Sequence, residues 1–485
     1  MPTPIDGLKP ALLWKYFAEI ARIPRCSKHE EAISEYVVST AKKLGLKAKQ
    51  DKYMNISVSM PASPGYERRK SIALQGHLDM VCEKNAVTEH DFSKDPIELV
   101  RKDGVIMANG TTLGADNGVA VATNLAIMED KSIEHGPLEF LFTVDEETGL
   151  TGATNLAGDM LVSKTLLNLD SEEEGSIYVG CSGGKDTTGT WKVGFKAAPA
   201  GSAAIRVAVK GLKGGHSGLE IDKGRGNAIK ILNRLLIRLA DLDARLSHID
   251  GGNKRNAIPR ECEAVLLIPK KALPKARDVA KKFEAAAKAE IATVDPDLSI
   301  VLEEVKGKKK MRVMKRAEQR SILMAIASLP HGYLKVSADI PGLIETSTNV
   351  AAIQTSKKGV LLATSQRSSV ASELAEAVQT VSSIFELSGA SVENSDGYPG
   401  WKPNLNSPVL KLAKETYRSL YGKDPTVKAI HAGLECGIIG EKYPGMDMIS
   451  FGPTLEGVHS PDEKIYIDTV ERFYAFLLAI LKSAG

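Results

Sequence analysis

The sequence predicts an α/β fold with a mostly parallel sheet flanked by helices, plus an inserted two-lobed domain of α+β type. Helical patterns alternate with short apolar runs from residue 10 to about 186, a different succession of strands and helices fills residues 187–395, and residues 396–485 return to the first pattern. Such alternation is typical of layered α/β domains. We therefore expect one discontinuous domain, residues 1–186 with 396–485, into which residues 187–395 are inserted as a lid.

The first segment begins with a predicted helix, because Leu13, Phe17 and Ile20 are spaced as one helical face. Short apolar runs at 71–80, 138–147 and 165–174 are then expected to be strands. Each run ends in acids or a histidine. Open α/β sheets gather ligands at the carboxyl ends of their strands, so these ends should meet at one site.

The inserted domain is predicted from longer elements. Strands are expected at 204–212, 261–269 and 298–305, with helices at 228–242 and 276–291, and a similar set follows. This repetition indicates two lobes.

Composition narrows the class of protein. The chain has 485 residues, 43% hydrophobic and 25% charged, enough for two or more domains. Its net charge of +3 does not favour nucleic acid or an anionic membrane as a partner. The basic run 305–316 lacks interleaved aromatic residues, so we interpret it as a solvated surface. The longest apolar run, 473–481, is shorter than the ~18–20 residues of a membrane span.

The N-terminal sequence and the cysteines indicate a compartment. No basic start followed by an apolar core is present, so no signal peptide is expected. The five cysteines are scattered and never form a CxxC pair. A reducing cytoplasm is the predicted location.

Several acids and histidines lie where chemistry is expected. His77 and Asp79 are two residues apart at a strand end, so their side chains face the same side. Asp116 lies in a glycine-rich turn before an apolar helix, where it could cap that helix or bind a metal. Glu146 and Glu147 are adjacent at a strand end, which for an isolated pair would suggest only a solvated loop. Asp170 and His459 complete the set.

Carboxylate and imidazole ligands without thiolates suit zinc, manganese or cobalt, and five of them exceed one tetrahedral site. Two metal ions are implied, with Asp116 as the bridge. The terminal ligands are then His77 with Asp170, and Glu147 with His459. Asp79 would orient His77, and one glutamate of the 146–147 pair would be the general base.

The motifs GHLDMV, GTTLGADNG, DEETG, NLDSEEEG, GGHSG, RNAIPRE, YPGWKPN, HAGLECG and GPTLEGVHSPDE together resemble the aminoacyl-histidine dipeptidases (Xaa-His dipeptidases, peptidase D, bacterial carnosinases) of the di-zinc aminoacylase and carboxypeptidase superfamily. The resemblance runs from about residue 10 to the C-terminus. It implies hydrolysis of unblocked dipeptides, including carnosine, with Glu146 as base and Asp79 as a second catalytic carboxylate. The metal positions it implies are His77, Asp116, Glu147, Asp170 and His459. It also implies a cis peptide bond between Asp116 and Asn117.

The resemblance further assigns substrate-binding residues. His216 matches a lid histidine that stabilises the oxyanion, and Arg367 matches the residue that pairs with the substrate's terminal carboxylate. Asn256 and Gly433 match substrate-contacting positions, although structural roles in turns explain them equally well.

Some alternatives stay open. Another exopeptidase or an amide deacylase of the same superfamily would share the metal core. A non-hydrolytic binding protein would require a lost base or ligand, and none is lost. The sequence leaves open the preferred dipeptide, the metal, and whether the chain is a monomer or a homodimer.

Overall fold

The computed structural model describes residues 3–305 and 311–484, so residues 306–310 of the basic run lie outside the described part. The chain divides into two compact units. The first unit comprises Met1–Cys181, Trp401–Ala429 and Leu434–Gly485, and the second comprises Ser182–Gly400 with Ile430–Gly433. Residues 430–433 therefore group with the insertion. Whether the second unit acts as a lid remains a prediction.

The first unit is built on a sheet with the strand order β1-β2-β6-β3-β7-β23-β8-β22 in the described part of the chain. Its strands are β1 (Lys47–Gln50), β2 (Ile56–Met60), β3 (Ile72–His77), β6 (Leu138–Thr143), β7 (Thr165–Asn168), β8 (Ser176–Cys181), β22 (Thr426–Ile430) and β23 (Asp447–Ser450). The central strands β6, β3, β7 and β23 are parallel, whereas β1, β2 and β8 pair antiparallel. Every residue of β3 and β6 is buried, as in sheets covered on both faces. The predicted α/β class is confirmed.

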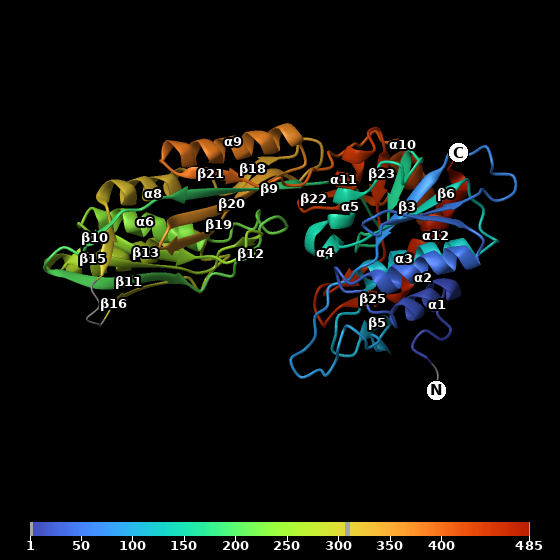
Figure 1. The fold of residues 1–485 in the computed structure, drawn as a ribbon, viewed down its shortest axis with the longest axis horizontal. Coiled ribbons are helices and arrows are strands. Elements are labelled where there is room, and N and C mark those ends of the chain that lie inside the picture. The colour runs from blue at the N-terminus through green and yellow to red at the C-terminus, as the bar shows by residue number, and fades with distance from the viewer. Residues whose placement is uncertain (1–2, 306–310, 485) are drawn as a thin grey trace. The chain divides into compact units, whose positions relative to one another are not determined.

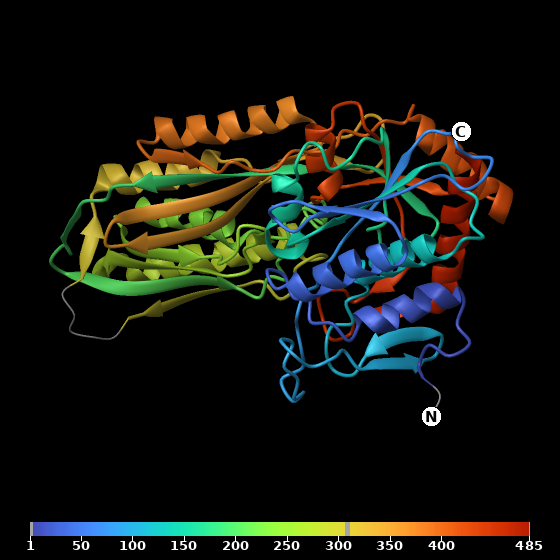
Figure 2. The same ribbon diagram turned by 45° about the vertical axis from the view of Figure 1, so that its right-hand side comes forward.

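Helices cover both faces of this sheet. They are α1 (Ala11–Ile20), α2 (Glu31–Lys43), α3 (Ala115–Glu129), α4 (Glu146–Gly149), α5 (Thr151–Asn155), α10 (Pro408–Tyr421), α11 (Glu435–Lys442) and α12 (Ile467–Ser483). Figures 1 and 2 show α1, α2 and α3 beside one another. Successive residues of a strand face opposite sides: Gly76 faces α3, and Gln75 bonds Glu435 of α11. The predicted N-terminal helix is confirmed, with Leu13 and Phe17 buried.

A smaller sheet completes the first unit. Its order is β24-β25-β5-β4, from β4 (Leu99–Lys102), β5 (Val105–Ala108), β24 (Leu455–Glu456) and β25 (Lys464–Tyr466). The turn between β24 and β25 carries His459, so this small sheet brings a C-terminal segment to the first half of the chain.

The second unit contains one long sheet in the order β16-β11-β15-β13-β19-β20-β9-β21, with β18 paired to β19. The strands are β9 (Gly183–Trp191), β11 (Ser202–Lys210), β13 (Arg245–Gly251), β15 (Cys262–Pro269), β16 (Ser299–Glu304), β18 (Gly332–Val336), β19 (Ile344–Ser356), β20 (Gly359–Ser368) and β21 (Ser391–Asn394). Strands β13 and β19 pair only where Asp250 and Gly251 meet Gln354 and Ile353. This short seam divides the sheet into two halves.

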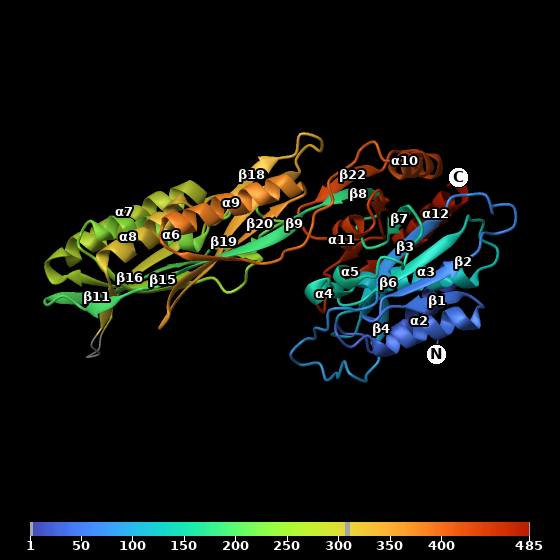
Figure 3. The ribbon, with the colours of Figure 1, turned by 45° about the horizontal axis from the view of Figure 1, so that its top comes forward.

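Helices α6 (Ala228–Ala240), α7 (Leu273–Ile291), α8 (Arg316–Ser328) and α9 (Ala371–Leu387) lie along one face of this sheet (Figure 3). The single-turn helix η1 (Lys270–Ala272) and two short ladders complete the unit: β10 (Phe195–Ala197) with β17 (Arg312–Met314), and β12 (Gly215–His216) with β14 (Ala257–Ile258). Helix α6 begins where the Asn227 side chain accepts hydrogen bonds from the amides of Ile229 and Lys230. One apolar core lies beneath the helices of both halves.

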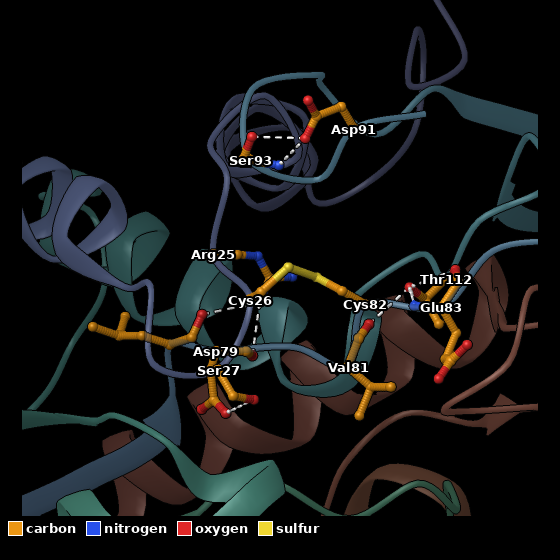
Figure 4. The surroundings of a disulfide bond; sticks show 11 residues. Arg25, Cys26, Ser27, Asp79, Val81, Cys82, Glu83, Asp91, Ser93 and Thr112 are labelled. Atoms are coloured by element: carbon orange, nitrogen blue, oxygen red, sulfur yellow. Dashed lines mark hydrogen bonds between the residues drawn. A yellow bond between two sulfur atoms is a disulfide. The ribbon is translucent and has the colours of Figure 1, made fainter. Parts of the chain in front are cut away.

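Cys26 and Cys82 form a disulfide, with a Cα–Cα distance of 5.7 Å and a sequence separation of 56. Figure 4 shows it next to Arg25 and near Asp79. The scattered cysteines gave no sign of this pair, and a disulfide is not what a reducing compartment would lead one to expect. Cys181, Cys262 and Cys436 are buried and free. Among the described residues, no helix has the length and apolar character needed to cross a membrane.

Candidate metal centre

The five predicted metal ligands come together in the first unit as two groups that share Asp116. His77 Nε2 lies 3.1 Å from Asp116 Oδ1 and 3.4 Å from Asp170 Oδ1. His459 Nε2 lies 3.2 Å from Asp116 Oδ2 and 2.9 Å from Glu147 Oε2. The two carboxylate oxygens of Asp116 therefore face different histidines. Within each group the ligand atoms lie within 4.8 Å of one another.

The turn at Asp116 is fixed by its neighbours. The peptide bond between Asp116 and Asn117 is cis, as predicted. The Asn117 side chain accepts a hydrogen bond from the His77 amide (3.2 Å) and donates one to the Leu169 carbonyl (2.9 Å). It thereby joins the ends of two parallel strands. A Cβ atom on Gly76 would lie 2.4 Å from Asn117 Oδ1, so this contact requires glycine. Asp116 lies inside α3 with a non-helical backbone, and in the described part of the chain its carboxylate oxygens pair with His77 and His459 and not with a backbone amide at the start of the helix.

Asp79 holds the glutamate pair in place. Strand β6 ends at Thr143, and Asp145 turns the chain with a left-handed φ of 49° into α4. The fully buried Asp79 carboxylate accepts hydrogen bonds from the amides of Glu146 (3.1 Å) and Glu147 (3.2 Å). The same carboxylate lies 3.2 Å from His77 Nδ1. The acidic pair is thus part of a built site, although Glu146 also lies within ligand distance of His77 and Glu147.

The charges of this cluster favour bound cations. Burial alone would lower the pKa of His77, but the charge of Asp170 and hydrogen bonds to Asp116 and Asp79 raise this pKa well above its ordinary value. Hydrogen bonds to Asp116 and Glu147 raise the pKa of His459 to about 11. Burial raises the pKa of Asp170 to about 6. The excess of carboxylates therefore attracts positive charge, as protons or as metal.

The donor set also fits divalent ions. Glu147 Oε1 and Asp170 Oδ1 are buried without a hydrogen-bond partner in the described part of the chain. Buried carboxylate oxygens normally have partners, and a metal ion would supply them. His459 has a left-handed φ of 61°, an uncommon conformation for a non-glycine residue and one often found at functional sites. Oxygen and imidazole ligands without thiolate suit zinc, manganese or cobalt.

The predicted substrate-binding residues all belong to the second unit. His216 Nδ1 accepts hydrogen bonds from the amides of Gly218 (3.2 Å) and Leu219 (3.0 Å). The neutral ring therefore carries its proton on Nε2. Burial and the charge of Arg367 lower the pKa of His216 to about 4, so the ring is a neutral N–H donor at pH 7. His216 and the exposed Asn256 line a cavity of about 790 Å³ within this unit.

Arg367 is buried and only partly satisfied. Its Nη1 donates to the Tyr398 hydroxyl (2.8 Å), while its Nε is buried without a partner among the described residues. A Cβ atom on Gly433 would lie 3.0 Å from the Tyr398 ring. Arg367 and Gly433 are therefore both packed around Tyr398.

Sequence reasoning missed several charged or titratable residues. His431 is buried, its Nε2 lies 2.7 Å from Ser347 Oγ, and burial with the charge of Arg367 lowers its pKa to about 3. Glu435 accepts hydrogen bonds from Gln75 (2.6 Å) and Thr143 (2.7 Å) beneath the metal ligands. Arg25 and Glu463 are buried beside the Asp116 turn. His431, Glu435 and Glu463 lie in motifs already singled out, which was the available signal, whereas Arg25 lies in none.

Comparisons with known proteins identify the family of the chain. Residues 73–483 match the model of Peptidase family M20/M25/M40. The cytosol non-specific dipeptidase of Escherichia coli is 42% identical over 479 residues, 99% of this chain and 98% of that protein. The crystal structure of aminoacylhistidine dipeptidase from Vibrio alginolyticus is similar with a TM-score of 0.91 and 41% identity, covering 99% and 98% of the two chains. Aminopeptidase PepT from Bacillus cereus, at 17% identity, TM-score 0.56 and 98% coverage of both chains, shares the fold. The family predicted from the motifs is confirmed: the chain belongs to Peptidase family M20/M25/M40.

Proposed function

We propose that this metallo-dipeptidase hydrolyses unblocked dipeptides, Xaa-His dipeptides such as carnosine among them, with two divalent ions held by the cluster around Asp116. Zinc is the proposed metal, with manganese and cobalt as alternatives, and the cytoplasm is the proposed location. The E. coli relative is named as a cytosolic dipeptidase, and the similar V. alginolyticus structure is named as an aminoacylhistidine dipeptidase.

The observation that carries the proposal is the orientation of the Asp116 carboxylate. One oxygen faces His77 (3.1 Å) and the other faces His459 (3.2 Å). Asp170 accompanies His77, and Glu147 accompanies His459, so each side has a similar set of ligands. This arrangement supports a shared carboxylate between two ions. When bound, such ions polarise the scissile carbonyl and lower the pKa of a water molecule.

Glu146 is the proposed general base. Its amide is held by Asp79, which also holds the amide of Glu147 and orients the His77 ring. Burial raises the pKa of Glu146 well above its ordinary value, which suits a group that takes a proton and returns it. Glu146 would accept a proton from the attacking water and deliver it to the leaving nitrogen. Asp79 would keep the base and the ligand at a fixed separation.

The second unit would supply substrate recognition as a lid. His216 offers a neutral Nε2–H, which suits an oxyanion that forms on the carbonyl oxygen. Arg367 offers a buried donor with no partner among the described residues, which suits the terminal carboxylate of a dipeptide. Asn256 and Gly433 are proposed to contact the substrate.

A panel of substrates tests the proposal. Zinc-loaded protein should cleave free dipeptides faster than tripeptides, amidated dipeptides and N-acetyl amino acids, and removal of the metal with a chelator should abolish all turnover. Preference for tripeptides would favour another exopeptidase, and preference for N-acetyl amino acids would favour a deacylase. Either result would overturn the dipeptidase assignment.

A further inference from the structure

Glu463 is a buried carboxylate that is saturated by backbone amides. Its Oε2 accepts hydrogen bonds from Leu113 (2.7 Å) and Gly114 (2.9 Å), and its Oε1 accepts them from Ala115 (2.7 Å) and Asp116 (3.2 Å). The residue is 2% exposed. Four donors on two oxygens leave little capacity for a further partner. Glu463 therefore serves the backbone of this turn and is not an additional metal ligand.

The position of Glu463 in the chain links two proposed ligands. It follows His459 by four residues in the turn between β24 and β25. Its carboxylate accepts a hydrogen bond from the amide of Asp116, which is some 350 residues away in the sequence. One side chain therefore ties the turn that carries His459 to the turn that carries Asp116. The separation between these two ligands depends on this link.

Arg25 contacts the same turn from the N-terminal segment. Its Nη1 donates to the carbonyls of Leu78 and Asp79, both at 3.0 Å, and its Nη2 donates to the carbonyl of Gly114. The first two carbonyls directly follow His77. The side chain is 3% exposed, and the negative charges near it are those of Glu463 and of the acids of the cluster. Arg25 thus joins the end of β3 to the turn before Asp116.

Two glycines make room for this arginine. A Cβ atom on Gly114 would lie 2.4 Å from Arg25 Nη2, and one on Gly118 would lie 2.7 Å from it. Gly114 also has a left-handed φ of 71°. Gly114 and Gly118 of the GTTLGADNG motif are therefore explained by the close approach of Arg25 to the backbone.

We propose that Glu463 and Arg25 are positioning residues that hold the Asp116 backbone so that its two carboxylate oxygens face the two ligand groups. The inference rests on the proposed two-ion centre. Hydrogen bonds to charged groups are roughly twice as strong as those between neutral groups, and seven of them converge on the segments carrying His77, Asp116 and His459. Neither residue touches the substrate in this assignment. Their effect is on metal affinity, through the geometry of Asp116.

The main test is Glu463→Gln. The substitution keeps the shape but replaces one acceptor oxygen by an NH₂ group, which would face backbone N–H donors. We expect zinc affinity, measured without substrate by competition with a chromophoric chelator, to fall about 10–100-fold, the range found for residues that orient metal ligands. Turnover lost at limiting zinc should return at high zinc with KM unchanged. Glu456→Gln is the matched control, because Glu456 lies before the same turn and pairs at the surface with Lys464 (2.9 Å).

Two conservative variants keep the inference testable if Glu463→Gln does not fold. Arg25→Lys keeps the charge but loses the planar fork, and Glu463→Asp keeps the charge but shortens the reach. Both should weaken zinc binding while circular dichroism shows a native fold. The inference would be overturned, and the proposed function left standing, if a folded Glu463→Gln bound zinc within about twofold of wild type. The same would hold if both conservative variants did so. Absence of zinc binding by the wild type would overturn both proposals, and zinc binding without dipeptide hydrolysis would overturn only the function.

Discussion

Two pairs of histidines, one in each unit, have pKa values that are shifted in opposite directions. In the first unit His77 and His459 lie among carboxylates, and their pKa values are raised. In the second unit His216 and His431 lie near Arg367, and their pKa values are lowered to about 4 and about 3 by burial and by that positive charge. The residue type is the same in both places, so the difference comes from the surroundings. The carboxylates of the first cluster attract cations, and the second cluster, near a buried arginine, is where we propose that an anionic group binds.

Removing the shared carboxylate should have the largest effect on the first cluster. We expect Asp116→Ala to lose bound metal after dialysis and to lower kcat/KM by more than about 10⁴-fold, because both ligand groups depend on this residue. Metal analysis and single-turnover kinetics would check this. Two equivalents of metal retained by a folded Asp116→Ala protein would show that the two groups do not share this bridge.

Neutralising one carboxylate without removing a ligand should separate charge from chemistry. Glu146→Gln should keep its metal, and its kcat should fall about 10²–10⁴-fold because the proton acceptor is lost. The adjacent Glu147→Ala is the matched comparison, since it should lose metal as well as activity. Near-normal turnover in Glu146→Gln, or metal loss equal to that of Glu147→Ala, would reverse the roles assigned to the pair.

Variants of the second cluster should each change mainly one kinetic constant, kcat or KM, and should leave the metal content unchanged. His216→Ala should mainly lower kcat, by about 10²–10³-fold if its N–H meets the oxyanion in the transition state. Arg367→Ala should mainly raise KM for free dipeptides, and wild-type protein should cleave amidated dipeptides poorly. A raised KM in His216→Ala with a lowered kcat in Arg367→Ala would contradict these roles. Equal cleavage of free and amidated dipeptides would show that the second cluster does not bind the substrate carboxylate.

In the metal-free protein, we expect the free energy of unfolding to fall at high pH because of His459 and at low pH because of His216. The folded-state pKa of His459, about 11, exceeds the ~6.5 of an unfolded histidine, so its stabilisation is complete below pH ~6.5 and is lost as pH rises toward 11. The pKa of His216 is lowered to about 4, so its contribution is present above pH ~6.5 and is lost as pH falls through 4.

Thermal melts of chelator-treated protein would measure these contributions. We expect Tm to fall between pH 7 and 9 less steeply in His459→Asn than in wild type, and to fall between pH 6 and 4 less steeply in His216→Asn. Added zinc should flatten the alkaline side only. Identical slopes for wild type and His459→Asn above pH 7 would contradict the raised pKa.

The parts of the site that sequence could predict are those recorded in local patterns. The apolar runs at 71–80 and 138–147 became β3 and β6, and their polar ends supplied His77 and Glu147, because parallel strands end at one edge. The contacts of Arg25 and Glu463 are different in kind. Both side chains bond to backbone atoms of distant segments, so no side-chain pattern along the chain reports them.

The same limit explains the other omissions. The disulfide joins residues 56 positions apart with no spacing motif, so pairing could be seen only in three dimensions. Residues 430–433 return to the second unit for four residues within a segment predicted to belong to the first. His431 lies in this returning stretch, two residues before Gly433. Its hydrogen-bond partner Ser347 lies on β19, far away in the sequence, so the sequence does not indicate this contact.

The close fit of Arg25 against Gly114 and Gly118 has a consequence for how this sequence can change over evolution. A methyl group at either glycine would meet the guanidinium, so the size of residues 114 and 118 and the identity of residue 25 cannot vary independently. Substitutions at residues in contact are generally non-additive. A lineage that lost the arginine would be released from part of the demand for glycine at 118, whereas the left-handed backbone would still demand it at 114. Among related chains, alanine at 118 should therefore accompany a smaller residue at 25, and glycine at 114 should persist in both cases.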